Sequence, residues 1–238
     1  MSKKIFDDDA FVKHIGIGDE LKFAKNQFSK LRIDLTWAGT DLDLCAFLLD
    51  KDMLINERGD LVYYNSQIRW KTKREFCDPD FDPLDGEMSR WPNSDYSNKR
   101  RWMDETLPLS GDGSVIGSWD DMAEDEDDLS LKQETLHILL RDVDTNRYDY
   151  IVLAAAVAPD RIAAGETFAD ANNPKATIYD AEKGEIIAEY QLDIVAPGKD
   201  AVCFGKMRFD QDNAIWSFLP MADGYKGGME YLAREVFN

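Results

Sequence analysis

The chain has 238 residues, of which 44% are hydrophobic and 11% aromatic, so it can fill the core of one large domain. Its 47 acidic residues outnumber its 28 basic residues and give a formal net charge of −19. This charge argues against nucleic acid and anionic membrane surfaces as partners, because both attract cationic proteins. It favours cations and basic proteins instead.

Cysteine and histidine usage restricts the chemistry further. Cys45, Cys77 and Cys203 are odd in number, far apart and in no CxxC motif, which does not fit a disulfide framework. We therefore expect a reducing, cytoplasmic setting. The two histidines, His14 and His137, are too few for a typical zinc hydrolase. No apolar stretch approaches about 18 residues and the N-terminal residues lack an apolar core segment, so we expect neither a membrane span nor a secretory signal.

The first half of the chain contains strand patterns. Apolar and polar residues alternate over 31–37 and again over 42–48, which is typical of half-buried strands. A third strand is predicted over 61–64, entered through a turn at 58–60.

Residues 66–109 have a different character. They contain Trp70, Trp91, Trp102 and a basic run at 99–101, and they show little periodicity. We expect an irregular insertion with short pieces of structure. Its tryptophans should cover apolar surface of this chain or of a partner, because large aromatic side chains are costly to leave in water.

The second half returns to regular patterns. Apolar residues alternate over 136–140, and the continuous apolar run 151–157 predicts a buried central strand. Turn residues at 182–184 and 210–213 lie between apolar segments and predict two hairpins. Helical spacing over 227–237 predicts a short C-terminal helix. Together these elements predict a mainly β chain: a two-sheet β-sandwich of about ten strands with a long insertion.

Two acidic features suggest a metal. Residues 119–128 carry seven carboxylates in ten positions, and such density raises the carboxyl pKa values unless a cation lies among them. Asp41 and Asp43, two apart on a strand, point the same way and can converge on one ion. Oxygen ligands of this kind suit Ca²⁺. Each feature has a simpler alternative, a solvated acidic loop and the polar face of a strand, because like-charge runs are usually exposed.

Other catalytic and binding motifs are missing. We find no G-x-S-x-G, no phosphate-binding G-x-x-x-x-G-K-[ST] and no complete EF-hand loop, since Ala214 interrupts the one that begins at Asp210. Glycoside hydrolysis needs a pair of carboxylates. Acidic residues are so abundant here that the presence of such a pair does not indicate this activity.

Several segments together resemble one known family. These are LRIDLTW, TDLDLCAFLLD and GDLVYYN, then DGSVIGSWDD and EDEDDLSL, then IVLAAAV, AVCFGKMRF and GYKGGMEYLA. In this order they resemble the TerD family of tellurium-resistance and calcium-binding stress proteins. The resemblance covers residues 28–65 and 110–237. We therefore expect an N-terminal extension, 1–27, followed by one domain, 28–238, that carries the insertion 66–109.

The resemblance implies a β-sandwich that binds Ca²⁺ through acidic loops at one end. The positions that match the family's metal-binding blocks are Asp41, Asp43, Asn65, Asp120, Glu126, Asp127 and Asp128, and Asn173 stands where the family often has Asn. The family's G-D-N is here Trp119-Asp120-Asp121, so the number of calcium ions stays open.

Three functions are compatible with these features. The first is a non-enzymatic, calcium-binding stress-response protein that presents a surface to other proteins of an assembly. The second is a hydrolase with a carboxylate-bound divalent metal, in which residues 66–109 form a lid. The third is a metal-free interaction module whose acidic face binds a basic partner. The resemblance favours the first.

Overall fold

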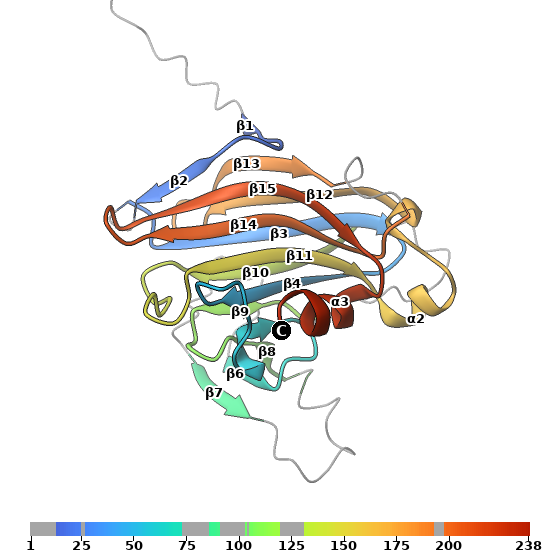
Figure 1. The fold of residues 1–238 in the computed structure, drawn as a ribbon, viewed down its shortest axis with the longest axis horizontal. Helices are drawn as coiled ribbons and strands as arrows, with labels where there is room; N and C mark the ends of the chain where they lie inside the picture. The colour runs from blue at the N-terminus through green and yellow to red at the C-terminus, as the bar shows by residue number, and fades with distance from the viewer. Residues whose placement is uncertain are drawn as a thin grey trace, which may run out of the picture.

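The computed structural model of the chain describes residues 13–24, 27–72, 86–90, 103, 105–119, 131–192 and 198–238. Two six-stranded sheets face each other and enclose the main hydrophobic core (Figure 1). This arrangement confirms the predicted β-sandwich. None of the helices in the described part of the chain is long and apolar enough to cross a membrane.

Each sheet combines strands from both halves of the chain. Sheet A contains, in spatial order, β1 (Lys13–His14), β13 (Glu185–Gln191), β12 (Ala171–Asp180), β3 (Lys30–Gly39), β10 (Lys132–Leu139) and β9 (Val115–Gly117). Sheet B contains β2 (Leu21–Ala24), β15 (Ile215–Tyr225), β14 (Ala201–Asp210), β11 (Tyr150–Val157), β4 (Leu42–Leu49) and β5 (Leu61–Val62). The short helical segments are η1 (Arg58–Asp60), α2 (Pro159–Ala163), η3 (Phe168–Asp170), α3 (Gly228–Tyr231) and the π-helical turn η4 (Leu232–Val236).

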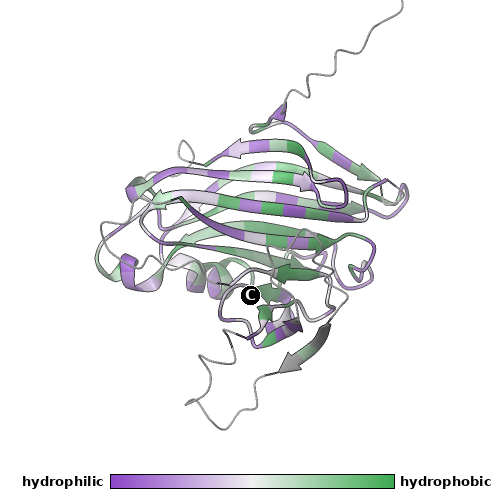
Figure 2. Cartoon of the chain, turned by 180° about the vertical axis from the view of Figure 1, so that it is seen from behind, coloured by the Kyte–Doolittle hydropathy of each residue, from purple (hydrophilic) through white to green (hydrophobic). Residues whose placement is uncertain are grey.

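Alternation along β3 explains how sheet A separates core from solvent. Leu31, Ile33 and Leu35 face the core and are almost fully buried. Arg32 and Asp34 lie between them on the outer face, where their side chains form an ion pair of 3.1 Å. Figure 2 shows sheet A from this outer side, with hydrophilic and hydrophobic residues alternating along its strands.

Sheet B differs because a helix covers part of its outer face. Along β11, Ile151 and Leu153 contact the core between the sheets, whereas Val152 and Ala154 contact a second apolar cluster that includes Leu232 of η4. Figure 1 shows α3 lying in front of this sheet. A strand that is covered on both sides needs apolar residues at every position. The continuous apolar run 151–157, the central strand and the C-terminal helix are thus confirmed together.

The chain termini and turns complete both sheets. The predicted hairpins are confirmed as β12–β13 and β14–β15. Within the N-terminal segment 1–27, β1 pairs in parallel with β13 and β2 pairs in antiparallel with β15.

The insertion supplies a third sheet that closes one edge of the sandwich. Sheet C has the order β7 (Gly86–Arg90), β6 (Ile68–Thr72) and β8 (Leu107–Pro108). Just after β8, Leu109 forms a β-bridge with Ile116 of β9, which joins sheet C to the edge of sheet A. A small apolar cluster of Leu107, Leu109 and Ile116 lies there, with Trp70 packed against it. The expectation that Trp70 covers apolar surface is confirmed; Trp91, Trp102 and the basic run 99–101 lie outside the described residues.

Arg69 of β6 fixes the insertion to the sandwich. Its side chain is almost fully buried. The guanidinium donates to Thr106 Oγ1 (2.8 Å), to the Thr106 carbonyl (2.7 Å), to the Met103 carbonyl (3.1 Å) and to the Tyr64 carbonyl (2.5 Å). One buried cation near the start of the insertion therefore satisfies acceptors from the end of the insertion and from the segment before it.

Substitution of Arg69 tests whether the insertion belongs to the fold. Arg69→Met keeps most of the volume but leaves these acceptors without their donor, so we expect unfolding free energy to fall by about 3 kcal/mol. Urea unfolding measures the change. Arg58→Met is the matched control, because Arg58 is exposed and donates to Gln67 at 3.3 Å. Equal stability of the two variants would contradict a structural role for the insertion.

A buried histidine on sheet A generates a second prediction. Burial lowers the pKa of His137 to about 3, with the positive charges of Lys30 and Arg32 adding to the effect. Between that value and the ordinary value of about 6.5, the unfolded chain binds a proton that the folded chain does not. Stability should therefore fall as the pH drops below about 6.5.

His137→Gln should remove this part of the pH dependence. We expect the wild-type chain to lose about 1 kcal/mol more per pH unit than the variant between pH 6.5 and pH 4.5. Urea unfolding at several pH values measures both slopes. Parallel slopes would show that His137 does not stay neutral in the folded chain.

Candidate metal site

Several strands of both sheets begin or end at the same end of the sandwich. Lys132, at the start of β10, pairs with Trp37 near the end of β3, and Ala171, at the start of β12, pairs with Gly39. In sheet B, the end of β11 pairs with the start of β4. The loops that follow or precede these strands therefore open at the same end, on the right in Figure 1. We call it the acidic end.

The first predicted pair lies here. Asp41 directly precedes β4, and its carbonyl accepts a hydrogen bond of 3.0 Å from the backbone of Ala158. Asp43 lies on β4, is only 3% exposed, and belongs to the outer side of sheet B, in phase with Cys45 and opposite to Leu44. The strand thus turns the Asp43 carboxylate toward the side that carries the C-terminal helix.

Asn65 is brought to Asp43 by the pairing of β5 with β4. Val62 pairs with Ala46, so the chain beyond β5 continues beside the start of β4. Asp43 and Asn65 line one pocket together with Tyr63 and Tyr64. Burial raises the pKa of Tyr63, a hydrogen bond with Asn65 opposes the shift, and the negative charge of Asp43 adds to it.

Asn173 has a different placement. It lies on β12 with a φ of 51°, within the irregular register between Asn172 and Lys175. Its side chain is exposed and does not line the pocket that Asp43 and Asn65 share. The register still locates it near Gly39, at the acidic end.

The remaining predicted ligands lie outside the described residues: Asp120, Glu126, Asp127 and Asp128. The residues on either side of this segment are described. Ser118 donates a backbone hydrogen bond of 2.8 Å to Thr135, and Lys132 lies opposite Trp37. The described residues on either side of the acidic segment, Ser118 and Lys132, therefore lie at the end of sheet A where Asp41 precedes β4.

Glu134 is a carboxylate at this end that the sequence prediction missed. It is 5% exposed, and its Oε2 accepts a hydrogen bond of 2.5 Å from the backbone of Leu44, which joins β10 to β4. Burial raises the pKa of the Cys45 thiol, and the charges of Cys203, Asp43 and Glu134 add to the shift. The sequence could have indicated this residue, because Glu134 lies two residues before Leu136 on the same strand and therefore on the same, inward-facing side.

The donor set fits calcium in kind but is incomplete in number. Asp41, Asp43 and Asn65 offer only oxygen ligands, which hard cations such as Ca²⁺ prefer. In the described part of the chain, no three His, Cys, Asp or Glu side chains lie close enough to hold a metal ion. Calcium takes six to eight oxygens, so further ligands have to come from outside the described residues or from water.

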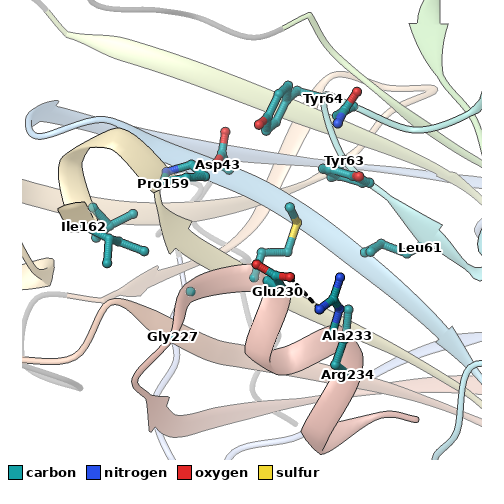
Figure 3. Close-up of a pocket in the computed structure, with 14 residues that line it drawn as sticks. Asp43, Leu61, Tyr63, Tyr64, Pro159, Ile162, Gly227, Glu230, Ala233 and Arg234 are labelled. Carbon is teal, nitrogen blue, oxygen red and sulfur yellow. Dashed lines mark ion pairs between the residues drawn. The ribbon is translucent and has the colours of Figure 1, made fainter.

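The pocket beside Asp43 has a volume of about 530 Å³. Figure 3 shows Asp43, Tyr63 and Tyr64 on one side and the helix residues Glu230 and Arg234 on the other. The full lining is Asp43, Leu61, Tyr63, Tyr64, Asn65, Val157, Pro159, Ile162, Gly227, Gly228, Met229, Glu230, Ala233 and Arg234. We call this space the helix pocket.

Comparison with known proteins assigns the family. The TerD domain matches residues 108–236, which is more than half of the chain. The chain belongs to the TerD family. The match begins at the end of the insertion, and the predicted resemblance is confirmed. No curated protein sequence matches this TerD-family chain.

Two solved structures share the TerD-family fold. The crystal structure of SAV2460, a protein of unknown function, has a TM-score of 0.55 at 18% identity and covers 88% of this chain and 96% of its own. SCO6318 from Streptomyces coelicolor A3(2), a homologue of telluride resistance protein (TerD), has a TM-score of 0.51 at 14% identity and covers 88% and 97%. At such identities the likeness concerns the fold alone.

Proposed function

We propose that this TerD-family chain is a non-enzymatic, calcium-binding stress-response protein whose acidic end holds Ca²⁺ and presents a surface to partner proteins. The observation that carries the proposal is the strand register. It directs Asp41, Asp43 and Asn65 to one end of the sandwich, where the described residues on either side of the acidic segment also lie. Membership of the TerD family supports the non-catalytic role.

Electrostatics supports a bound cation at this end. Seven carboxylates in residues 119–128 repel one another, and the whole chain carries a net charge of −19. A divalent ion among these groups would offset the repulsion and hold the loops in one arrangement. Loops ordered in this way form a defined surface for a partner. The name of SCO6318, a homologue of telluride resistance protein, is consistent with such a role in stress resistance.

Calcium should raise the melting temperature of the chain. An ion that binds only the folded state stabilises it by about 2.7 kcal/mol when its concentration is about 100 times Kd. Mg²⁺ should stabilise less, because it requires tighter octahedral geometry. Asp41→Asn and Asp43→Asn should each reduce the calcium-induced shift by more than half. Thermal unfolding with millimolar Ca²⁺, with Mg²⁺ and with a chelator measures these shifts.

Asp212→Asn is the control for these variants. Asp212 is an exposed acid in the β14–β15 turn, away from the acidic end. It should respond to calcium as the wild-type chain does. A melting temperature that changes with neither calcium nor chelator would contradict the proposal.

Protons should compete with the ion. Carboxylates that coordinate a metal must be ionised, so calcium affinity should fall as the pH approaches the carboxylate range. Isothermal titration should give weaker calcium binding at pH 5 than at pH 7. Equal affinity at both pH values would exclude carboxylate ligation.

A further inference from the structure

We propose that the helix pocket binds a neutral aromatic group, either on a free small molecule or as the phenylalanine or tryptophan side chain of a partner protein. The walls of the pocket carry this ligand class, which does not depend on bound calcium. Only the expected effect of calcium on the binding rests on the function proposed above.

Most of the pocket wall is apolar or aromatic. Four residues line the pocket, pack against the apolar cluster on the outer side of sheet B and are only half-buried: Leu61, Tyr63, Met229 and Ala233. Ile162 of α2 lies across the pocket from Leu61 in Figure 3. The pocket is therefore an open continuation of an apolar cluster. A ligand that covers this surface gains hydrophobic free energy.

The shape of the wall favours an aromatic ring. The rings of Tyr63 and Tyr64 lie 5.4 Å apart and are nearly perpendicular, at 82°. Aromatic rings prefer edge-to-face and offset-stacked contacts, and two perpendicular rings offer a third ring both kinds of surface. Met229 adds a flexible thioether to the lining. Such a group adapts to the ligand and contacts aromatic rings favourably.

The charged groups of the pocket do not favour an ionic ligand. Asp43 is 3% exposed and already interacts with other groups of the chain, so a neutral ligand removes little more of it from water. At the rim, Glu230 and Arg234 form an ion pair of 2.8 Å, and their side chains are 69% and 72% exposed. A solvated pair of this kind interacts weakly with a further charge.

The helix side of the pocket is shaped by the fold. Gly228, the first residue of α3, has a φ of 62°, which favours glycine. Its backbone donates a hydrogen bond of 2.9 Å to Asp200, and a Cβ atom at this position would lie 2.7 Å from Ile162 Cδ1. Glycine therefore allows α3 to lie close to α2. The resulting volume of about 530 Å³ is in the range of small-ligand sites.

Calcium should strengthen this binding. Asp43 and Asn65 belong both to the proposed calcium ligands and to the lining of the pocket. Tyr63 and Tyr64 directly precede Asn65 in the chain. An ion held by Asp43 and Asn65 would fix the segment that carries both rings, and a prearranged wall loses less freedom when the ligand binds. We expect calcium to tighten binding of an aromatic probe several-fold.

The test uses the full-length chain and two aromatic probes, followed by NMR of the backbone amides. Indole represents a free molecule, and the blocked tripeptide Gly-Trp-Gly represents a partner side chain. The signals of Tyr63, Tyr64 and Met229 should shift. Blocked tripeptides with lysine or glutamate in the middle should bind at least about tenfold more weakly, which corresponds to about 1.4 kcal/mol. Equal binding of the charged peptides, or no binding of either aromatic probe, would overturn the proposal.

The two probes also separate the sources of the ligand. Tripeptide binding at least as tight as that of indole would assign a partner side chain, and binding of indole alone would assign a free aromatic molecule. The affinity for indole should stay unchanged between low salt and about 0.5 M NaCl, because screening acts on charges. A large loss of affinity with salt would contradict a neutral ligand.

Variants locate the binding. Ala233→Phe fills the pocket and should weaken indole binding at least about tenfold. Glu235→Phe is the matched control, because it adds the same ring to the same helical turn at an exposed position that does not line the pocket. Ile162→Ala removes part of the opposite wall and should weaken binding several-fold, which keeps the test valid if Ala233→Phe is unstable. Unchanged affinity in both pocket variants would overturn the assignment.

The outcomes keep the two proposals distinct. Indole binding in a chain whose melting temperature does not change with calcium would support the pocket and contradict the calcium-binding function. A calcium response without binding of either aromatic probe would do the reverse. Weaker indole binding in the presence of calcium would contradict the shared use of this wall.

Discussion

The antiparallel register of β3 with its neighbours is the constraint on which the proposed site depends. Because β10 and β12 both pair with β3, the segments that connect them to the rest of the chain open beside the turn that leads into β4. Asp41 and the described residues on either side of the acidic segment, Ser118 and Lys132, reach one end of the sandwich for this reason. The pairing of β5 with β4 brings Asn65 to the same end. A slip of one residue in β3 would exchange its core and solvent faces and move these loops apart.

Two additions extend the sandwich. The C-terminal helix covers part of the outer side of sheet B and lines the helix pocket together with Asp43. Sheet C closes the edge of sheet A beside β9, where Arg69 binds carbonyls from distant segments. The described part of the insertion is therefore built into the edge of the sandwich, and Trp70 packs against its apolar cluster. These contacts give the insertion a structural role, beside any contact that it makes with partners.

The elements that could be predicted from the sequence are those whose pattern of apolar and polar residues is local and regular. Alternation in β3, the continuous apolar run of β11 and the helical spacing after residue 227 each reflect which faces are covered, so these elements could be recognised. Sheet C could not be recognised, because β6 pairs with β8 across more than thirty residues. Glu134 could have been recognised because it lies in phase with Leu136 on β10. The helix pocket is lined by residues of or near β4, β5, α2 and α3. No local sequence pattern predicts that these elements lie side by side.

The most direct test of the account is the position of the ion itself. Crystals of the full chain grown with Ca²⁺, or soaked with a lanthanide surrogate, would locate it by anomalous diffraction. The account predicts a peak at the acidic end, with carboxylate oxygens of Asp41 or Asp43 and of residues 120–128 at about 2.3–2.6 Å for calcium. A metal peak elsewhere in the molecule, or none at saturating calcium, would contradict the claim that this end is a calcium site.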